Sequence, residues 1–279
     1  MEEVRNIILK RPKNRSIVLD TFYSKEFKNQ PIVIFCHGYK GFKDWGAWNL
    51  MCQYLANLGM GVVKFNFSHN GGTTENPIDF PDLEAFGQNN YSKELNDLND
   101  ILDWTQNHFR NNSFVNPSNI NLIGHSRGGG IVILKTAEDV RIKKVITLAG
   151  VSDFETRFGN PEEIELWEKS GVKHVINGRT KQEMPHYYQF YEDYLANKER
   201  LNIKNATKNI SIPHLIIHGN NDTSVKIDEA IALHQWNPKS KLEIIKGADH
   251  VFNTKHPWDK DELSEELNLV VENIIDFIK

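Results

Sequence analysis

Residues 121–134, NLIGHSRGGGIVIL, decide the fold of this 279-residue chain. Leu122 and Ile123 form an apolar, β-prone start, and the residues from Gly128 onward begin like a packed helix. A strand that turns abruptly into a helix around Ser126 needs small residues on both sides, because the two elements nearly collide there. The stretch therefore predicts a strand–turn–helix unit with a serine at its turn.

Within this stretch, residues 124–128 (GHSRG) fit the pattern G-x-S-x-G. In a strand–turn–helix context this pattern is typical of a nucleophile elbow, in which the serine hydroxyl projects above a sheet. Gly124 and Gly128 would leave room for the tight turn. The alternative is a glycine-rich helix start that binds an anion with backbone N–H groups. The flanking strand and helix favour a nucleophilic role for Ser126.

Short apolar runs and helical patterns alternate through most of the chain, which is typical of a sheet built from βαβ units. Continuous apolar strands suit a parallel sheet covered on both faces. Helical spacing of apolar residues occurs at 91–110 and 263–278. The predicted strands lie at 4–9, 16–22, 32–35, 62–67, 120–123, 145–148, 214–217 and 242–245.

One segment, from about 152 to 207, interrupts this alternation. It has no strand-like run, but it contains amphipathic, aromatic-rich stretches such as EEIELWEKSG and MPHYYQFYEDYLANKERL. The segment is too long for an ordinary connection, so we expect a helical cap inserted into a single domain at 1–279. Its tyrosines either fix a cap helix or line a pocket for an apolar or aromatic acyl group. The pocket candidates are Tyr187, Tyr188 and Tyr191.

A serine hydroxyl needs a base to become a good nucleophile. Asp222 and His250 each follow a predicted strand, in HGNND and GADH. Because parallel strands bring their C-terminal ends to one edge, we expect both side chains to meet Ser126 there. His250 would take the serine proton and Asp222 would orient the imidazole. Asp153, which also follows a predicted strand, is the main rival for the acid.

Two backbone N–H groups are candidates for stabilising an oxyanion. Arg127 follows the serine at the helix start, and Tyr39 lies in the loop CHGYKGFKDWG. Gly38 and Gly41 would let this loop approach a substrate, although a plain glycine turn is the alternative. His69, in the loop SHNGGTTENP, either packs within that loop or lines the pocket.

Composition excludes several classes of partner. The net charge of −4 and pI near 6.3 make nucleic acid and anionic membrane surfaces poor partners. Eleven scattered histidines form no metal-binding pattern such as HExxH. Cys36 and Cys52 lie in apolar patterns, which predicts buried thiols. No run approaches the roughly 20 apolar residues of a membrane span, and the N-terminus lacks a signal-peptide core, so we expect a cytoplasmic protein.

The elbow, the His37-Gly38 loop, HGNNDTSV and GADHVF, in this order, resemble the serine α/β-hydrolases. The likeness runs from about Pro31 to the C-terminus. It is greatest to cinnamoyl (feruloyl) esterases, dienelactone-hydrolase-type proteins and prolyl-oligopeptidase-type catalytic domains. Dienelactone hydrolases have a cysteine where this chain has Ser126, and 279 residues leave no room for the oligopeptidase β-propeller.

This resemblance implies the α/β-hydrolase fold, with a mostly parallel eight-stranded sheet and helices on both faces. It implies Ser126 as nucleophile, Asp222 and His250 as its partners, and N–H groups of Tyr39 and Arg127 as oxyanion donors. Cinnamoyl esterases also carry a cap between their sixth and seventh strands, where residues 152–207 fall.

The leading hypothesis is a serine carboxylic ester hydrolase that forms an acyl-enzyme with small or aromatic, hydroxycinnamoyl-type esters. It would need no metal or organic cofactor, and its partner would be the small-molecule ester. The alternatives are a serine peptidase or amidase, a thioesterase or acyltransferase, and a non-catalytic binding protein. The complete Ser–Asp–His set speaks against the last of these. A monomer and a homodimer are both compatible with the sequence.

Overall fold

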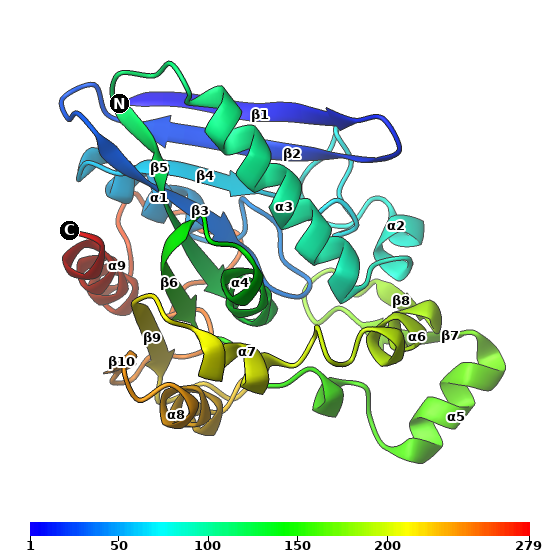
Figure 1. Cartoon of the computed structure of the whole chain (residues 1–279). Coiled ribbons are helices and arrows are strands. Elements are labelled where there is room, and N and C mark those ends of the chain that lie inside the picture. Colours follow the sequence, from blue (N-terminus) through cyan, green and yellow to red (C-terminus); the bar gives the residue numbers. More distant parts are fainter.

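An eight-stranded sheet forms the centre of the protein in the computed structural model, which describes residues 1–279. The strand order is β1-β2-β4-β3-β5-β6-β9-β10 (Figure 1). The β1–β2 and β2–β4 pairs are antiparallel and all other pairs are parallel. The predicted mostly parallel sheet is therefore confirmed. The strands are β1 (Glu2–Arg11), β2 (Asn14–Tyr23), β3 (Gln30–Cys36), β4 (Gly61–Phe65), β5 (Val115–His125), β6 (Ile142–Leu148), β9 (His214–Gly219) and β10 (Lys241–Ile245).

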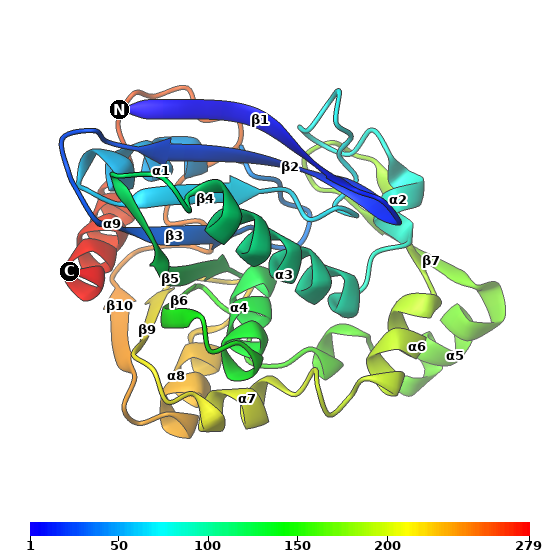
Figure 2. The ribbon, with the colours of Figure 1, turned by 45° about the horizontal axis from the view of Figure 1, so that its top comes forward.

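Helices cover both faces of this sheet (Figure 2). One face carries α3 (Tyr91–His108), α4 (Arg127–Glu138) and α8 (Ile227–Trp236), and the other carries α1 (Trp48–Asn57) and α9 (Glu265–Ile278). Helix α9 illustrates why: Leu267, Val270 and Ile274 recur at helical spacing and are buried. The Ser264 side chain accepts a hydrogen bond from the Leu267 N–H and so fixes the start of α9.

Both cysteines are free and buried, as predicted. Cys36 ends β3 and Cys52 lies in α1. Burial raises the pKa of both thiols, that of Cys52 to about 12, so both are neutral at ordinary pH. Neither therefore has the thiolate character that cysteine nucleophiles and metal ligands need.

The chain between β6 and β9, residues 149–213, makes a long excursion that we call the β6–β9 segment. It contains η1 (Glu155–Arg157), α5 (Pro161–Ser170), β7 (Val172–Ile176), β8 (Glu183–Tyr187), α6 (Gln189–Ala196) and α7 (Ile203–Asn209). Figure 1 shows α5, α6 and the hairpin set off from the sheet, with β8 beside α2 (Leu83–Gly87).

The expectation of a purely helical segment at 152–207 is wrong, because β7 and β8 form a two-stranded antiparallel sheet. Gly171, in the left-handed conformation at φ 72°, ends α5 directly before β7. The next residues, VKHVI, include β-branched side chains that favour a strand. The hairpin lacks a clear alternation of apolar and polar residues because β7 is largely exposed.

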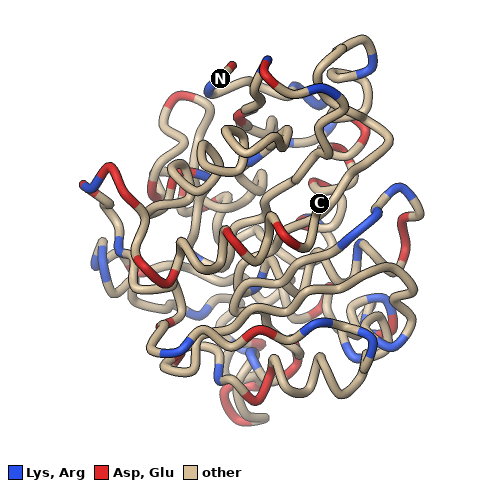
Figure 3. The backbone as a smooth tube through the Cα atoms, turned by 90° about the vertical axis from the view of Figure 1, so that its left-hand side faces the viewer, with Lys and Arg blue, Asp and Glu red and all other residues tan.

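No helix of the structure combines the length and the apolar character that crossing a bilayer requires. Lysine and arginine are interspersed with aspartate and glutamate along the backbone trace (Figure 3).

Candidate active site

Ser126 joins β5 to α4 in a strained backbone conformation, with φ 55° and ψ −120°. A positive φ is uncommon for a residue with a side chain, and such strain is retained where the surrounding structure enforces it. Here the Ser126 N–H donates a hydrogen bond to the Leu148 carbonyl oxygen at the end of β6, at 2.9 Å. The turn is thereby fixed to the neighbouring strand.

The glycines on either side of Ser126 are required by close approach. A Cβ atom on Gly124 would lie 2.2 Å from the Gly128 carbonyl oxygen. One on Gly128 would lie 2.5 Å from the Cys36 carbonyl oxygen at the end of β3. Both distances are far below van der Waals contact, so strand and helix crowd together here as the sequence suggests.

His250 and Asp222 meet Ser126 at this edge of the sheet. The Ser126 Oγ lies 3.0 Å from His250 Nε2, and His250 Nδ1 lies 2.7 Å from Asp222 Oδ2. Asp222 follows β9 and His250 follows β10. With Nδ1–H donated to the carboxylate, Nε2 is left as the acceptor that faces the serine hydroxyl.

The Asp222 carboxylate is held by four donors. Its Oδ1 accepts from the N–H groups of Ser224 and Val225 at 2.8 and 2.9 Å. Its Oδ2 lies 3.3 Å from His218 Nε2 in addition to its bond with His250. Burial opposes ionisation, but the hydrogen bonds from His218 and His250 outweigh it and hold the pKa of Asp222 well below its usual range. The group is thus a carboxylate at all ordinary pH values.

Two further histidines support this arrangement. The sequence indicates a structural role for His218 in its turn and gives no role to His125. His218 Nε2 lies 2.8 Å from the Val225 carbonyl oxygen as well as near Asp222. His125 Nε2 donates to the backbone carbonyl oxygen of His250 at 2.8 Å. Burial, aided by the nearby His250, lowers the pKa of His125 to about 3, so it is a neutral donor. Its only signal in the sequence is its place next to Ser126.

The loop after β3, residues 37–46, passes directly against the serine. A Cβ atom on Gly38 would lie 2.8 Å from Ser126 Cβ. The Tyr39 N–H that follows donates to no acceptor in the structure. Arg127 is the first residue of α4, where a helix leaves its N–H groups without intrahelical partners. Both N–H groups are free to bind a ligand, and their role as oxyanion donors stays a prediction.

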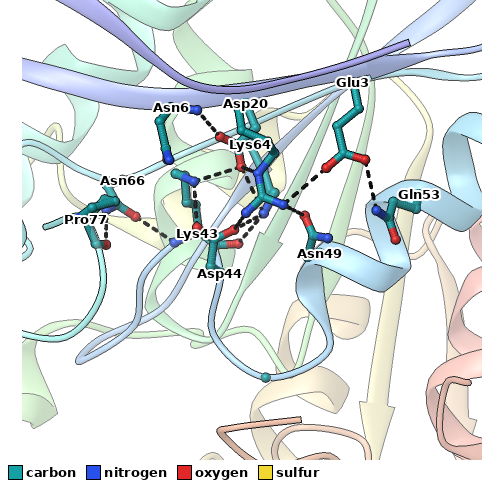
Figure 4. Close-up of polar contacts among 12 residues, drawn as sticks. Glu3, Asn6, Asp20, Lys43, Asp44, Asn49, Gln53, Lys64, Asn66 and Pro77 are labelled. Carbon is teal, nitrogen blue, oxygen red and sulfur yellow. Dashed lines mark hydrogen bonds and ion pairs between the residues drawn. The ribbon is translucent and has the colours of Figure 1, made fainter. Parts of the chain in front are cut away.

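A buried ion-pair network anchors this loop to the sheet (Figure 4). The Asp20 Oδ2 atom lies 2.8 Å from the Lys43 ammonium and 3.1 Å from that of Lys64, and all three side chains are fully buried. Asp44 pairs with both lysines. Arg5 of β1 reaches Asp20 and Asp44 at 2.9 and 2.6 Å. The network therefore joins β1, β2 and β4 to the loop that carries Tyr39.

A cavity of about 500 Å³ opens beside Ser126 and His250. Aromatic side chains from both the sheet domain and the β6–β9 segment form much of its wall. They are Tyr39, Tyr91, Phe154, Phe158, Trp167 and Phe190. A smaller cavity of about 230 Å³ also borders the serine, and the two cavities share Tyr39, Lys40, Ser126 and His250.

The predicted pocket residues do not line the larger cavity. His69 bonds within its own loop, to Ser68 Oγ at 2.8 Å. Tyr187 projects outward to Glu84, because side chains alternate along β8 and His186 takes the inward position. Tyr188 and Tyr191 instead contact other aromatic rings of the β6–β9 segment, Trp167 and Phe158. His186 and Phe190 are the members of that stretch that line the cavity.

Asp153, the rival for the acid, lies away from the site, and the acidic, histidine and cysteine side chains form no metal-binding cluster. Asp153 accepts a hydrogen bond from the Thr156 N–H at 2.8 Å and has no contact with His250. No group of three or more His, Cys, Asp or Glu side chains in residues 1–279 is arranged to hold a metal ion.

Comparison with known proteins places this chain in a family. The sequence profile of the prolyl oligopeptidase family matches residues 47–274, which is most of the chain. No curated protein matches the chain in sequence.

Several solved structures are similar over nearly their whole length. Est1E from Butyrivibrio proteoclasticus with bound ferulic acid has a TM-score of 0.70 and 19% identity, and the match covers 98% of this chain and 97% of Est1E. The esterase domain of a Rhodothermus marinus protein has a TM-score of 0.65 and 17% identity, and the match covers 100% of both chains. Dienelactone hydrolase from Anabaena variabilis has a TM-score of 0.62 and 16% identity, and the match covers 99% of this chain and 96% of that protein. At these identities the likeness shows the α/β-hydrolase fold.

Proposed function

Because the chain belongs to the prolyl oligopeptidase family of α/β-hydrolases, we propose that it is a serine hydrolase that cleaves carboxylic esters through an acyl-enzyme. The observation that carries the proposal is the pair of hydrogen bonds, at 3.0 and 2.7 Å, that link Ser126, His250 and Asp222. A hydroxyl, a neutral imidazole and a carboxylate in this order form the arrangement that activates a serine nucleophile.

In the proposed reaction Ser126 Oγ attacks the ester carbonyl carbon while His250 Nε2 accepts the hydroxyl proton. The carbon–oxygen bond to the alcohol then breaks, and His250 returns the proton to the leaving alkoxide. Water next attacks the acyl-enzyme with His250 again as base, which releases the acid and restores the serine. Asp222 stabilises the imidazolium in both steps.

The tetrahedral intermediates carry a negative oxygen that needs donors already in place. We assign this role to the backbone N–H groups of Tyr39 and Arg127. The close passage of Gly38 past Ser126 and the absence of any acceptor for the Tyr39 N–H support the assignment. We also propose that residues 152–207 act as a cap, since Phe158, Trp167 and Phe190 from this segment line the cavity.

The family name favours a second candidate, a serine peptidase. The lining of the larger cavity speaks against one form of it, in which a free amino terminus is held beside the scissile bond. Such a group would need a carboxylate partner, and no aspartate or glutamate lines that cavity. Aromatic walls instead suit small or aromatic acyl groups such as hydroxycinnamoyl esters.

The test is a panel of p-nitrophenyl and hydroxycinnamoyl esters, together with matched p-nitroanilides, on wild type and Ser126→Ala. We expect ester turnover to fall at least about 10³-fold in the variant. A fluorophosphonate probe should label wild type but not Ser126→Ala. The exposed Ser113 provides the control, because Ser113→Ala should keep both activity and labelling.

Equal ester rates in wild type and Ser126→Ala would overturn the proposal. If the anilides were hydrolysed as fast as the matched esters, the protein would be assigned as a peptidase and not as an esterase. Circular dichroism of both variants ensures that lost activity is not lost folding.

A further inference from the structure

The wall of the larger cavity contains positively charged side chains and no acidic ones. Its lining includes four cationic side chains and neither aspartate nor glutamate. The whole chain, by contrast, has a net charge of −4, with both signs interspersed along the trace (Figure 3). The positive charge is thus a local property of the cavity. The four residues are Lys40, Arg127, Arg157 and Lys173.

Two of these four cations lack a counter-ion. Arg157 pairs with Glu229, and Arg127 NH1 lies 3.4 Å from Glu94. The Lys173 ammonium donates to the Phe158 carbonyl oxygen at 3.0 Å and lies 3.8 Å from the Trp167 ring, and it forms no ion pair within 4.0 Å. The Lys40 ammonium lies 5.1 Å from the Tyr39 ring and has no ion-pair partner.

Arg127 also presents donors to the cavity. Its guanidinium lies 4.4 Å from the Tyr39 ring centroid, and its only hydrogen bond goes to Glu94. A guanidinium has five N–H donors in a planar fork, so most of those on Arg127 are unused. This fork follows directly after Ser126 in the chain and is half-buried among aromatic rings.

His186 reports the positive field at this wall. Its Nε2 lies 2.7 Å from the Tyr39 hydroxyl oxygen. Burial lowers the pKa of His186 to about 3, and the charges of Arg127, Lys173 and Lys40 act in the same direction. An unpaired ammonium in a partly buried site is relieved by a bound anion, because their attraction is little screened there.

We propose that the part of the ester that fills the larger cavity carries a negatively charged group, a carboxylate in the simplest case, attracted by Lys40, Arg127 and Lys173. Its apolar body packs on Phe158, Trp167 and Phe190. This inference rests on the proposed ester hydrolysis and names its substrate class. The chemistry is that of an aromatic or apolar monoester with a free acid group.

The kinetic test compares p-nitrophenyl 4-carboxycinnamate with p-nitrophenyl 4-carbamoylcinnamate, which differ by one negative charge at similar size. We expect kcat/KM to favour the carboxylate at least about tenfold at low ionic strength, with the ratio shrinking as salt is added. A second pair, 4-carboxyphenyl and 4-carbamoylphenyl cinnamate, moves the charge to the alcohol. Preference in either pair supports the proposal and identifies the half of the ester that enters the cavity.

Lys173→Met and Lys40→Met should each bring the carboxylate-to-amide ratio down toward one. The matched control is Lys169→Met, which removes a positive charge from exposed α5 outside the cavity. It should keep the wild-type ratio. Ratios near one in both ester pairs for the wild type would overturn the proposal.

Binding separates this inference from the proposed function. Calorimetry on Ser126→Ala compares 4-carboxycinnamamide with 4-carbamoylcinnamamide, and we expect the anion to bind about tenfold more tightly. If the anion bound more tightly but the wild-type protein hydrolysed no ester, the anion site would be supported and the proposed esterase activity would be contradicted. If ester hydrolysis depended on Ser126 but the two amides bound equally well, the esterase activity would be supported and the anion site would be contradicted.

Discussion

Asp222 is the residue on which the orientation of His250 depends. Its Oδ2 accepts from His250 Nδ1 at 2.7 Å, which fixes the imidazole tautomer. Its Oδ1 is occupied by two backbone N–H groups of the same turn. Substitution by asparagine preserves the side-chain shape but can place an amide N–H against Nδ1. The imidazole would then present Nε2–H to Ser126 and could not accept its proton.

We therefore predict that Asp222→Asn lowers kcat about 10³- to 10⁴-fold. The measurement is p-nitrophenyl ester turnover. The matched control is Asp153→Asn, at the carboxylate that lies away from His250. If Asp153→Asn lost the rate and Asp222→Asn kept it, the two acids would exchange roles.

At the scale of single residues, the sequence locates the three side chains of the candidate site better than it locates the pocket. Ser126, Asp222 and His250 each follow an apolar run, and parallel strands bring such ends together. Tyr187 could not be placed this way, because β8 (EMPHY) has no regular alternation of apolar and polar residues that would show which side each residue faces. His125 was not recognised because its bond goes to a backbone carbonyl oxygen distant in sequence.

Among the structural elements, the loop at 37–46 depends most on a single cluster of charges. Lys43 extends from this loop to the fully buried Asp20 of β2. Removing Lys43 would break its ion pairs with Asp20 and Asp44 and leave these carboxylates to Lys64 and Arg5. Breaking buried ion pairs by removing one partner typically costs about 3–5 kcal/mol. The same change would free the loop that carries Tyr39 next to Ser126.

We predict that Lys43→Met lowers the free energy of unfolding by about 3–5 kcal/mol and also lowers kcat. Urea denaturation measures the first effect and ester turnover the second. Lys169→Met, at an exposed i,i+4 pair with Glu165, should change stability by less than about 0.5 kcal/mol. Equal stabilities for the two variants would contradict the anchoring role of the network.

The strands of the main sheet could be predicted from the sequence, whereas the β7–β8 hairpin and the ion-pair network could not. All eight strands of the main sheet coincide with apolar runs such as 32–35 and 145–148. The β7–β8 hairpin was missed because its first strand is exposed. The network was missed because Lys43 and Lys64 look like surface residues in a sequence, and only the packing of β1 and β2 buries them.

Over the whole molecule, buried histidines set how stability responds to acid. Burial lowers the pKa of His37 to about 4 and those of His125, His186 and His214 to about 3, from an ordinary value of 6.5. Below pH 6.5 the unfolded chain therefore binds more protons than the folded one. Stability is fully present above this pH and is lost as pH falls toward 4.

We predict that the free energy of unfolding decreases steadily between pH 6.5 and 4.5. Each histidine contributes up to about 1.4 kcal/mol per pH unit. Glu94 and Asp97, whose pKa burial raises, oppose the trend in the same range but are fewer. Urea denaturation across this range is the measurement, and a flat profile would be the contrary result.

His214 offers a way to isolate one contribution, because neither of its ring nitrogens has a hydrogen-bond partner. It begins β9 at the strand end opposite Asp222. His214→Leu should make the free energy of unfolding fall less steeply with pH, by up to about 1.4 kcal/mol per pH unit, which is the contribution of one histidine. An unchanged slope would assign the acid sensitivity to other groups.

Two cavities have Ser126 and His250 in their walls. In the proposed reaction, an acyl group held in one of them would leave the other open, first to the departing alcohol and then to the incoming water. The order of product release, alcohol first and acid second, would then be favoured by the shape of the protein as well as by the chemistry.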